Sequence, residues 1–187
     1  MIDPATSALY KDVEKLLLHS DEISARVAEL SAEITRDYQG RALVCVCILK
    51  GAAFFFSDLV RRVDLPLSVD FMSISSYGSA TKSSGVVRIL KDLDRDIVGR
   101  DVLIIEDIID TGLTLSFLKE NLKARGAASL RVVTLLDKPC RRQVDLAPDY
   151  RGFEIEDYFV VGYGLDYNER YRNLPDIGVL RPEVYSE

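Results

Sequence analysis

Apolar residues recur at helical spacing in three segments of the chain, and each segment predicts an amphipathic α-helix. The first predicted helix has Ser20, a residue type favoured at helix starts, as its N-cap and ends near Gly40. The second ends before Pro66, because proline is not tolerated inside a helix. The apolar stripes are Ile23, Val27, Leu30 and Ile34 in the first segment, Phe54, Leu59 and Val63 in the second, and Leu115, Leu118 and Leu122 in the third.

Shorter apolar runs between these segments predict β-strands. The clearest is the uncharged run at 42–49, which is rich in Val and Ile and suits a strand buried on both faces. Strands and helices alternate along most of the chain, so the pattern predicts βαβ units. We therefore expect an α/β fold with an open, mostly parallel, twisted sheet flanked by helices. The other predicted strands span 69–74, 86–90, 102–105, 130–136 and 158–161.

Three segments carry neither pattern. Residues 75–85 contain five Ser and two Gly, and we expect them to be mobile. Residues 1–11 are expected to form a loose tail. Residues 162–187 are rich in loops and contain a dense polar cluster from Asp166 to Arg172. Because neither an internal repeat nor a linker interrupts the chain, one main domain is expected.

The composition fits a globular protein. Of the 187 residues, 48% are apolar and 29% are charged, which is far from the signature of disorder. The 24 Lys and Arg against 30 Asp and Glu give a net charge of −6. This balance argues against a general binder of nucleic acids or membrane surfaces, because such proteins need a basic stripe. If the ligand is an anion, the positive side chains that bind it must therefore be concentrated at its site.

The cysteines and the histidine narrow the choice of chemistry and compartment. Three cysteines form neither a disulfide framework nor a zinc-site spacing, so we interpret them, led by Cys45 and Cys47, as core thiols in a reducing compartment. No window approaches the roughly 20 apolar residues of a membrane span, and a cytosolic protein is expected. His19 is the only histidine, which argues against Ser-His-Asp catalysis and multi-histidine metal centres.

The segment at 102–115 has the chemistry of a ligand site. A buried strand leads to the carboxylates of Glu106 and Asp107 and then to Asp110. Ligands of open parallel sheets bind outside the carboxyl ends of the strands. Carboxylates there can accept hydrogen bonds from a ribose diol, directly or through a hydrated Mg²⁺. The alternative interpretation is an ordinary strand-to-helix turn with an acidic cap.

The turn that follows suits a phosphate. Gly112 permits a tight turn, and the helix after it adds the positive end of its dipole. Thr111 and Thr114 can donate hydroxyl hydrogen bonds. Other phosphate motifs are missing from the sequence, since no GxxxxGK[ST] occurs and Gly162-Tyr-Gly164 lacks the third glycine of a dinucleotide fingerprint.

The run at 106–114 resembles the phosphoribosyl-pyrophosphate motif of the type I phosphoribosyltransferases. Five more segments, in order, resemble the bacterial hypoxanthine-guanine phosphoribosyltransferases within that family. The resemblance extends from about residue 16 to residue 185, nearly the whole chain. The five segments are Leu49-Lys50-Gly51, Ser75-Ser76-Tyr77-Gly78, Leu136-Asp137-Lys138-Pro139, the run at 157–167 and the run at 170–175.

The resemblance implies a fold and a reaction. The fold would be that of the type I phosphoribosyltransferases, with residues 1–187 as a single domain and a small hood contributed by about 1–40 and 155–187. The reaction would be purine salvage, in which the 5-phosphoribosyl group passes from phosphoribosyl pyrophosphate to hypoxanthine or guanine. The products would be IMP or GMP and pyrophosphate, with oxocarbenium character at the ribose during transfer.

The resemblance also implies roles at the purine. Asp110 would be the general base for the ring nitrogen; its alternative role is an N-cap aspartate. Lys138 would donate to the purine O6, although a strand-end lysine is otherwise a solvated surface group. Phe159 would stack on the base while Val160 reads its edge through the backbone, and the alternative for both is core packing in a short strand.

At the ribose and the leaving group, the resemblance implies a metal site. Glu106 and Asp107 would bind the ribose hydroxyls and, together with Asp166, hold Mg²⁺. Arg172 would bind the departing pyrophosphate through a charge-assisted pair. Without the resemblance, residues 166–172 are interpreted as a solvated cluster of surface ions.

Two loops complete the implied site. Lys50 and Gly51 would contact pyrophosphate, in a loop that in the family has a cis peptide before the lysine. Ser76 and Tyr77 would belong to a loop that closes over the reacting centre and excludes water.

The 5′-phosphate would bind at the turn after the central strand. Many relatives have Lys, Arg or Asn where this chain has Leu113. Phosphate binding here would therefore depend on backbone amides and on two hydroxyls. The residues of this turn are Thr111, Gly112, Leu113 and Thr114.

The sequence leaves three alternatives. The preferred base could be xanthine or guanine, because base choice depends on loop backbone geometry. An RNA-binding regulator built on this fold would need a basic face, and the longest basic clusters are only Arg61-Arg62 and Arg141-Arg142. A catalytically silent interaction protein is disfavoured because every matched catalytic position is intact. The resemblance also implies a homodimer or homotetramer.

Overall fold

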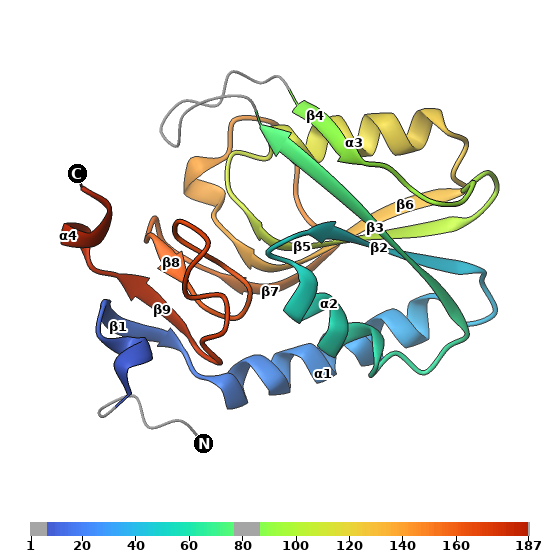
Figure 1. Ribbon diagram of the computed structural model, residues 1–187. Helices are drawn as coiled ribbons and strands as arrows, with labels where there is room; N and C mark the ends of the chain where they lie inside the picture. The colour runs from blue at the N-terminus through green and yellow to red at the C-terminus, as the bar shows by residue number, and fades with distance from the viewer. Residues whose placement is uncertain (1–6, 77–86, 187) are drawn as a thin grey trace.

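The computed structural model describes residues 7–76 and 87–186. Its centre is a six-stranded sheet with the strand order β4-β3-β2-β5-β6-β7 (Figure 1). Neighbouring strands run parallel, except that β3 and β4 are antiparallel. The predicted α/β fold with an open, mostly parallel sheet is confirmed. The strands are β2 (Leu43–Leu49), β3 (Leu67–Ser76), β4 (Val87–Lys91), β5 (Asp101–Ile109), β6 (Ser129–Asp137) and β7 (Tyr150–Glu154).

Helices cover both faces of this sheet. The helices α1 (Ser20–Asp37) and α2 (Ala53–Val60) lie on one face, and α3 (Leu113–Ala124) lies on the other (Figure 1). Successive residues of β2 enter opposite cores, so that Cys45 packs with α1 and α2 whereas Val46 packs with α3. Burial on both faces explains why this strand carries no charge.

A second, three-stranded sheet joins segments from near both ends of the described chain, in the order β1-β9-β8 (Figure 1). The buried carboxylate of Asp176 ties it to α1. The hydroxyl of Tyr10 donates to Asp176 Oδ2 at 2.5 Å, and the backbone amide of Ser20 donates to Oδ1 at 2.8 Å. The remaining elements are β1 (Val13–Leu18), β8 (Val160–Val161), β9 (Ile177–Leu180), α4 (Pro182–Tyr185) and the short 3₁₀ helices at Ala8–Tyr10 and Pro139–Arg141.

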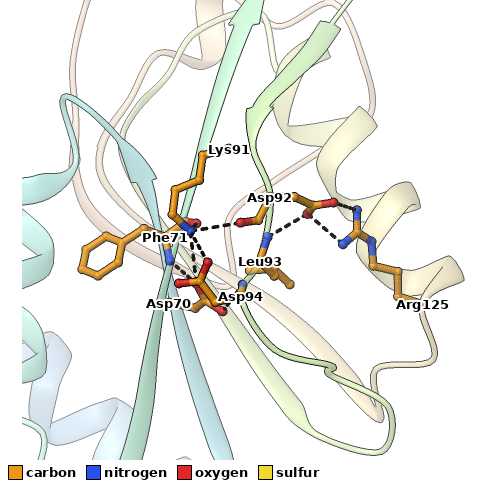
Figure 2. A network of polar contacts seen from close by, with 7 residues as sticks. All are labelled: Asp70, Phe71, Lys91, Asp92, Leu93, Asp94 and Arg125. Atoms are coloured by element: carbon orange, nitrogen blue, oxygen red, sulfur yellow. Dashed lines mark hydrogen bonds and ion pairs between the residues drawn. The ribbon is translucent and has the colours of Figure 1, made fainter.

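A network of charged side chains fastens the edge strand β4 (Figure 2). The ammonium group of Lys91 donates to two backbone carbonyl oxygens and to the carboxylate of Asp94, each at 3.0 Å. The buried Asp70 lies 3.7 Å from the same ammonium nitrogen. Arg125, at the C-cap of α3, forms a two-pronged pair with Asp92 at 2.8 and 2.9 Å. The network therefore joins the β3–β4 hairpin to the far end of α3.

Two helix boundaries differ from those predicted. The helix α1 begins at Ser20, so its N-cap is His19, whose backbone amide donates to the carboxylate of Glu22 at 2.8 Å. The helix α2 ends at Val60 and stops short of Val63. It ends early because the chain leaves the helix in a turn, in which the amide of residue 62 bonds three residues back at 3.0 Å.

The strand predictions also need correction. The central strand β5 continues beyond residue 105 to Ile109, because its pairing with β6 includes Glu106 and Ile109. The predicted strand at 158–161 is shorter and belongs to the second sheet. The strands β1, β7 and β9 were not predicted.

Three further expectations concern the N-terminal tail, the cysteines and the serine-rich segment. The prediction of a loose tail is wrong for Tyr10, which is buried, and residues 1–6 lie outside the described part. The prediction of core thiols is confirmed for Cys45 and Cys47, where burial raises the pKa of both to about 12, but it is wrong for Cys140, which is exposed. Most of the segment expected to be mobile also lies outside the described residues. No described helix is long and apolar enough to cross a membrane.

We expect Tyr10→Phe to destabilise the protein by about 1.5 to 3 kcal/mol, because it removes a buried hydrogen bond to the Asp176 carboxylate. Urea denaturation monitored by circular dichroism measures the change. An unaltered midpoint would show that the hydrogen bond from Tyr10 to Asp176 does not stabilise the protein.

Candidate active site

The end of the central strand β5 carries two adjacent carboxyl groups. Glu106 is buried, with 8% of its surface exposed, and Asp107 is half-buried. Burial raises the pKa of Glu106 well above its usual range, and the charge of Asp107 adds to this effect. Burial also raises the pKa of Asp107 to about 6, although the amide of Ile108 and the guanidinium of Arg172 oppose the shift. A nearby cation would stabilise the ionised form of both carboxyl groups.

The turn after β5 is shaped by glycine. Gly112 occupies the N-cap of α3 with a φ of +80°, and no side chain caps the helix. A Cβ atom at Gly112 would come within 2.9 Å of Val144 and 3.0 Å of Arg142. Asp110 precedes the cap by two residues, so its alternative interpretation as the N-cap aspartate is wrong. The amides of the first helical turn have no partners within the helix and can meet an anion.

A pocket of about 230 Å³ joins the buried carboxyl group of Glu106 to this turn. Five of the predicted site residues belong to its wall, whereas Asp107 and Leu113 do not. The acceptors suited to a sugar and the donors suited to a phosphate therefore share one pocket. Its lining consists of Ile48, Ile74, Glu106, Ile108, Ile109, Asp110, Thr111, Gly112, Thr114 and Leu115.

The loop after β2 packs directly against Asp107. The peptide bond between Leu49 and Lys50 is cis, as the resemblance implies. A Cβ atom at Gly51 would overlap the carboxylate of Asp107, and one at Gly164 would overlap the backbone carbonyl oxygen of Gly51. Both glycines are therefore required for three separate segments to meet beside the end of β5.

The polar cluster in the C-terminal part is an ordered set of ion pairs beside these glycines. Arg172 Nη2 lies 2.8 Å from Asp166 Oδ1, and Arg172 Nη1 donates to the carbonyl oxygen of Gly164 at 2.8 Å. The side chains of Arg172 and Asp166 are only 21% and 28% exposed. Glu169 bridges the two cations, with 3.0 Å to Lys50 Nζ and 3.4 Å to Arg172 Nη2. The interpretation of this segment as a solvated cluster is wrong for Asp166 and Arg172, whereas residues 168–170 are exposed as expected.

A third group of predicted residues follows β6. Lys138 is buried, and its ammonium group donates to the backbone carbonyl oxygen of Tyr158 at 2.5 Å, so it is not a solvated surface lysine. Burial lowers the pKa of Lys138, although the negative charge of Asp110 opposes the shift. Phe159 remains 38% exposed, whereas Val160 is buried in β8.

Two arginines just after Lys138 contact Asp110, and neither was predicted to belong to the site. Arg141 Nε lies 3.0 Å from Asp110 Oδ1. Arg142 Nη1 donates to the backbone carbonyl oxygen of Asp110 at 3.0 Å, and its Nη2 pairs with the buried carboxylate of Asp137. The available sequence signal is the pair of consecutive arginines close behind a strand-end lysine.

The three predicted metal ligands do not converge on one point. Within residues 7–76 and 87–186, no group of three His, Cys, Asp or Glu side chains could hold a metal ion by itself. Asp166 is nevertheless close enough to Asp107 for its charge to raise the pKa of Asp107. Of the predicted closing loop, Ser76 is the last residue of β3, and Tyr77 lies outside the described residues.

Comparison with known proteins identifies relatives over nearly the whole length. The profile of the phosphoribosyl transferase domain family matches residues 15–168. The hypoxanthine-guanine phosphoribosyltransferase of Bacillus subtilis is 56% identical over 174 residues, which make up 93% of this chain and 97% of that protein. The crystal structure of a hypoxanthine phosphoribosyltransferase from Staphylococcus aureus superposes with a TM-score of 0.94 at 54% identity, covering 97% of this chain and 99% of that one.

Some relatives are much longer. The bifunctional protein TilS/HprT of Listeria monocytogenes is 54% identical over 180 residues, or 96% of this chain. The chain spans only 28% of the length of that protein.

We expect the Glu106→Gln variant to be more stable than the wild type near neutral pH in the presence of a chelator. Folding raises the pKa of Glu106, so the native state binds its proton more tightly than the unfolded state. Its ionisation therefore costs stability as the pH rises above about 4.5, and glutamine avoids that cost. Urea denaturation of both proteins at about pH 4 and pH 8 measures the difference. A stability difference that is the same at both pH values would contradict the shift.

Proposed function

The chain belongs to the phosphoribosyltransferase family, and from this membership we propose that it transfers the 5-phosphoribosyl group of phosphoribosyl pyrophosphate to hypoxanthine or guanine. The products would be IMP or GMP and pyrophosphate. One observation carries the proposal, namely the single pocket in which Glu106 and Asp110 face a glycine turn at the start of α3. Hydrogen-bond acceptors for the sugar, a carboxylate that can accept a proton and a turn that can bind a phosphate are thus adjacent.

Asp110 is proposed as the general base that receives the proton of the purine ring nitrogen. Its side chain does not cap α3, and 41% of it is exposed. Arg141 holds the carboxylate at 3.0 Å in the free protein, so an incoming ring N–H would share or replace this partner. A positioned carboxylate within hydrogen-bond reach is the usual device for such a proton transfer.

Lys138, Phe159 and Val160 are proposed to hold the base. An ammonium group has three donors, and the carbonyl oxygen of Tyr158 occupies one of them, so Lys138 retains donors for the purine O6. A positive charge there would stabilise the negative charge that develops on the purine. The exposed ring of Phe159 offers a stacking surface, and the backbone of Val160 lies beside it in β8.

Mg²⁺ is the proposed cofactor, and the donor set fits it. Glu106, Asp107 and Asp166 are the residues that would hold it, because hard oxygen donors suit this ion and the pKa values of Glu106 and Asp107 are raised. No three of the described side chains form a complete cage, which agrees with an ion that keeps water and substrate oxygens as ligands. When bound, the ion would neutralise the charge of the pyrophosphate.

The chain's own cations are proposed to receive the two phosphate ends of the sugar donor. Lys50, Gly51 and Arg172 would bind the leaving pyrophosphate, which would compete with Glu169 for both cations. The 5′-phosphate would bind the turn from Thr111 to Thr114, including the amide of Leu113. The role of Ser76 and Tyr77 in closing the site stays a prediction.

The setting of the enzyme is part of the proposal. Free, buried thiols at Cys45 and Cys47 are consistent with the reducing cytosol. We propose that the protein acts there as a homodimer or homotetramer on small-molecule substrates, with the hood implied by the resemblance built around the second sheet.

Asp110→Ala is expected to lower kcat for hypoxanthine by about 10²- to 10⁴-fold, the usual contribution of a general base. The KM for phosphoribosyl pyrophosphate should change little. Steady-state kinetics measures both, with Asp145→Asn, an exposed carboxylate after β6, as the matched control. Turnover like that of the wild type would remove Asp110 from the role of base.

Turnover is expected to vanish with a chelator and to return with Mg²⁺, because the carboxylates at the end of β5 would otherwise repel the sugar donor. The same assay with hypoxanthine, guanine, xanthine and adenine determines the base preference. Undiminished turnover without a divalent cation would contradict the metal proposal, and a preference for xanthine or adenine would correct the proposed substrates.

A further inference from the structure

Three aromatic rings gather where the second sheet meets the purine side of the site. The rings of Phe159 and Tyr185 are stacked, with centroids 4.7 Å apart and planes 19° from parallel. Tyr167 meets both nearly edge-on, with centroids 5.7 Å from Phe159 and 6.4 Å from Tyr185. Tyr185 lies at the end of α4 and is not among the site residues predicted from the sequence.

Phe159 has one covered face and substantial open surface. Tyr185 stacks on one face of the ring, yet 38% of the residue is still exposed. The main chain of Phe159 is held in place, because its carbonyl oxygen accepts a hydrogen bond from the amide of Leu180 at 2.9 Å. The preceding carbonyl, that of Tyr158, accepts from Lys138. The backbone at Phe159 is therefore fixed between β9 and the lysine proposed to bind the purine O6, and these bonds leave the tilt of the ring to its side-chain neighbours.

The segment that carries Tyr185 is held to the rest of the protein. The amide of Arg181 donates to the carbonyl oxygen of Asp12 at 2.9 Å, just before α4 begins. Val184 and Tyr185 pack against the apolar core of the second sheet, which includes Tyr10 and Leu180. The side chain of Tyr185 is thus held in position by this packing, and its ring stacks on one face of the Phe159 ring.

We propose that Tyr185 is a positioning residue for the purine, acting through Phe159. It fills the face of Phe159 opposite the bound base, so the base, Phe159 and Tyr185 form one continuous stack. Offset stacking between aromatic rings is favourable, and a ring backed by a second ring has less freedom to tilt away from its ligand. This inference rests on the proposed function, because it needs a purine on the open face of Phe159.

The test compares four variants by steady-state kinetics with each substrate varied in turn. Tyr185→Ala should raise the KM for hypoxanthine and guanine by about two- to tenfold, the range that one aromatic pair supports. The KM for phosphoribosyl pyrophosphate should stay close to that of the wild type. Tyr185→Phe keeps the ring and should restore the wild-type KM, whereas Tyr185→Leu keeps bulk without a ring and should not. Glu183→Ala, an exposed change in the same short helix, is the matched control.

Each other outcome overturns the proposal. An unchanged purine KM in Tyr185→Ala would show that the stack does not position the base. A lowered KM would show that Tyr185 occupies the place of the purine in the free protein. An equal rise for both substrates, or a rise in Glu183→Ala, would show a general disturbance of the second sheet. A wild-type chain that turns over no purine overturns the proposed function itself, and this result is seen before any variant is compared.

Discussion

The packing of two carboxyl groups at the end of the central strand is the constraint on which the rest of the site depends. Glu106 and Asp107 lie inside β5, where strand pairing continues, so they cannot swing away into solvent as residues of a loop would. Burying them raises their pKa values and creates a demand for positive charge. The positive charge of Arg172 partly stabilises the ionised form of Asp107. A metal ion and the positive end of the α3 dipole are suited to supply further positive charge.

The segment after β6 joins the side of the site proposed to bind the purine to the side proposed to bind the phosphate. The amide of Lys138 donates to the carbonyl oxygen of Ile109, and the amide of Gln143 donates to that of Thr111, both at 2.9 Å. Arg142 holds the carbonyl of Asp110 between these two bonds. The ends of β5 and β6 therefore form one unit, and the distance between Lys138 and the turn at Gly112 is set by backbone hydrogen bonds.

The sequence predicted helices and strands best where their apolar side chains are fully buried. The run at 42–49 and the stripe of α3 predict their elements because the apolar side chains of β2 and of that stripe pack into the two cores. The strands β1, β7 and β9 were missed because they are short or mix exposed and buried positions, and two of them pair in a separate sheet between distant parts of the chain. The motif at 106–114 was recognised by its resemblance because its residues are consecutive in the sequence, whereas the contacts of Arg141 and Arg142 with Asp110 arise only when two strand ends become neighbours.

The close approach of Gly51, Asp107 and Gly164 has an evolutionary consequence. The space that a methyl group would need at residue 51 is filled by the carboxylate of residue 107, and the space at residue 164 is filled by the carbonyl of residue 51. No single substitution at either glycine can be accommodated without moving its neighbour, and a shorter side chain at residue 107 would remove a carboxyl group from the site. A side chain at residue 51 therefore requires a compensating movement or change at residue 107, and one at residue 164 requires a shift of the backbone at residue 51.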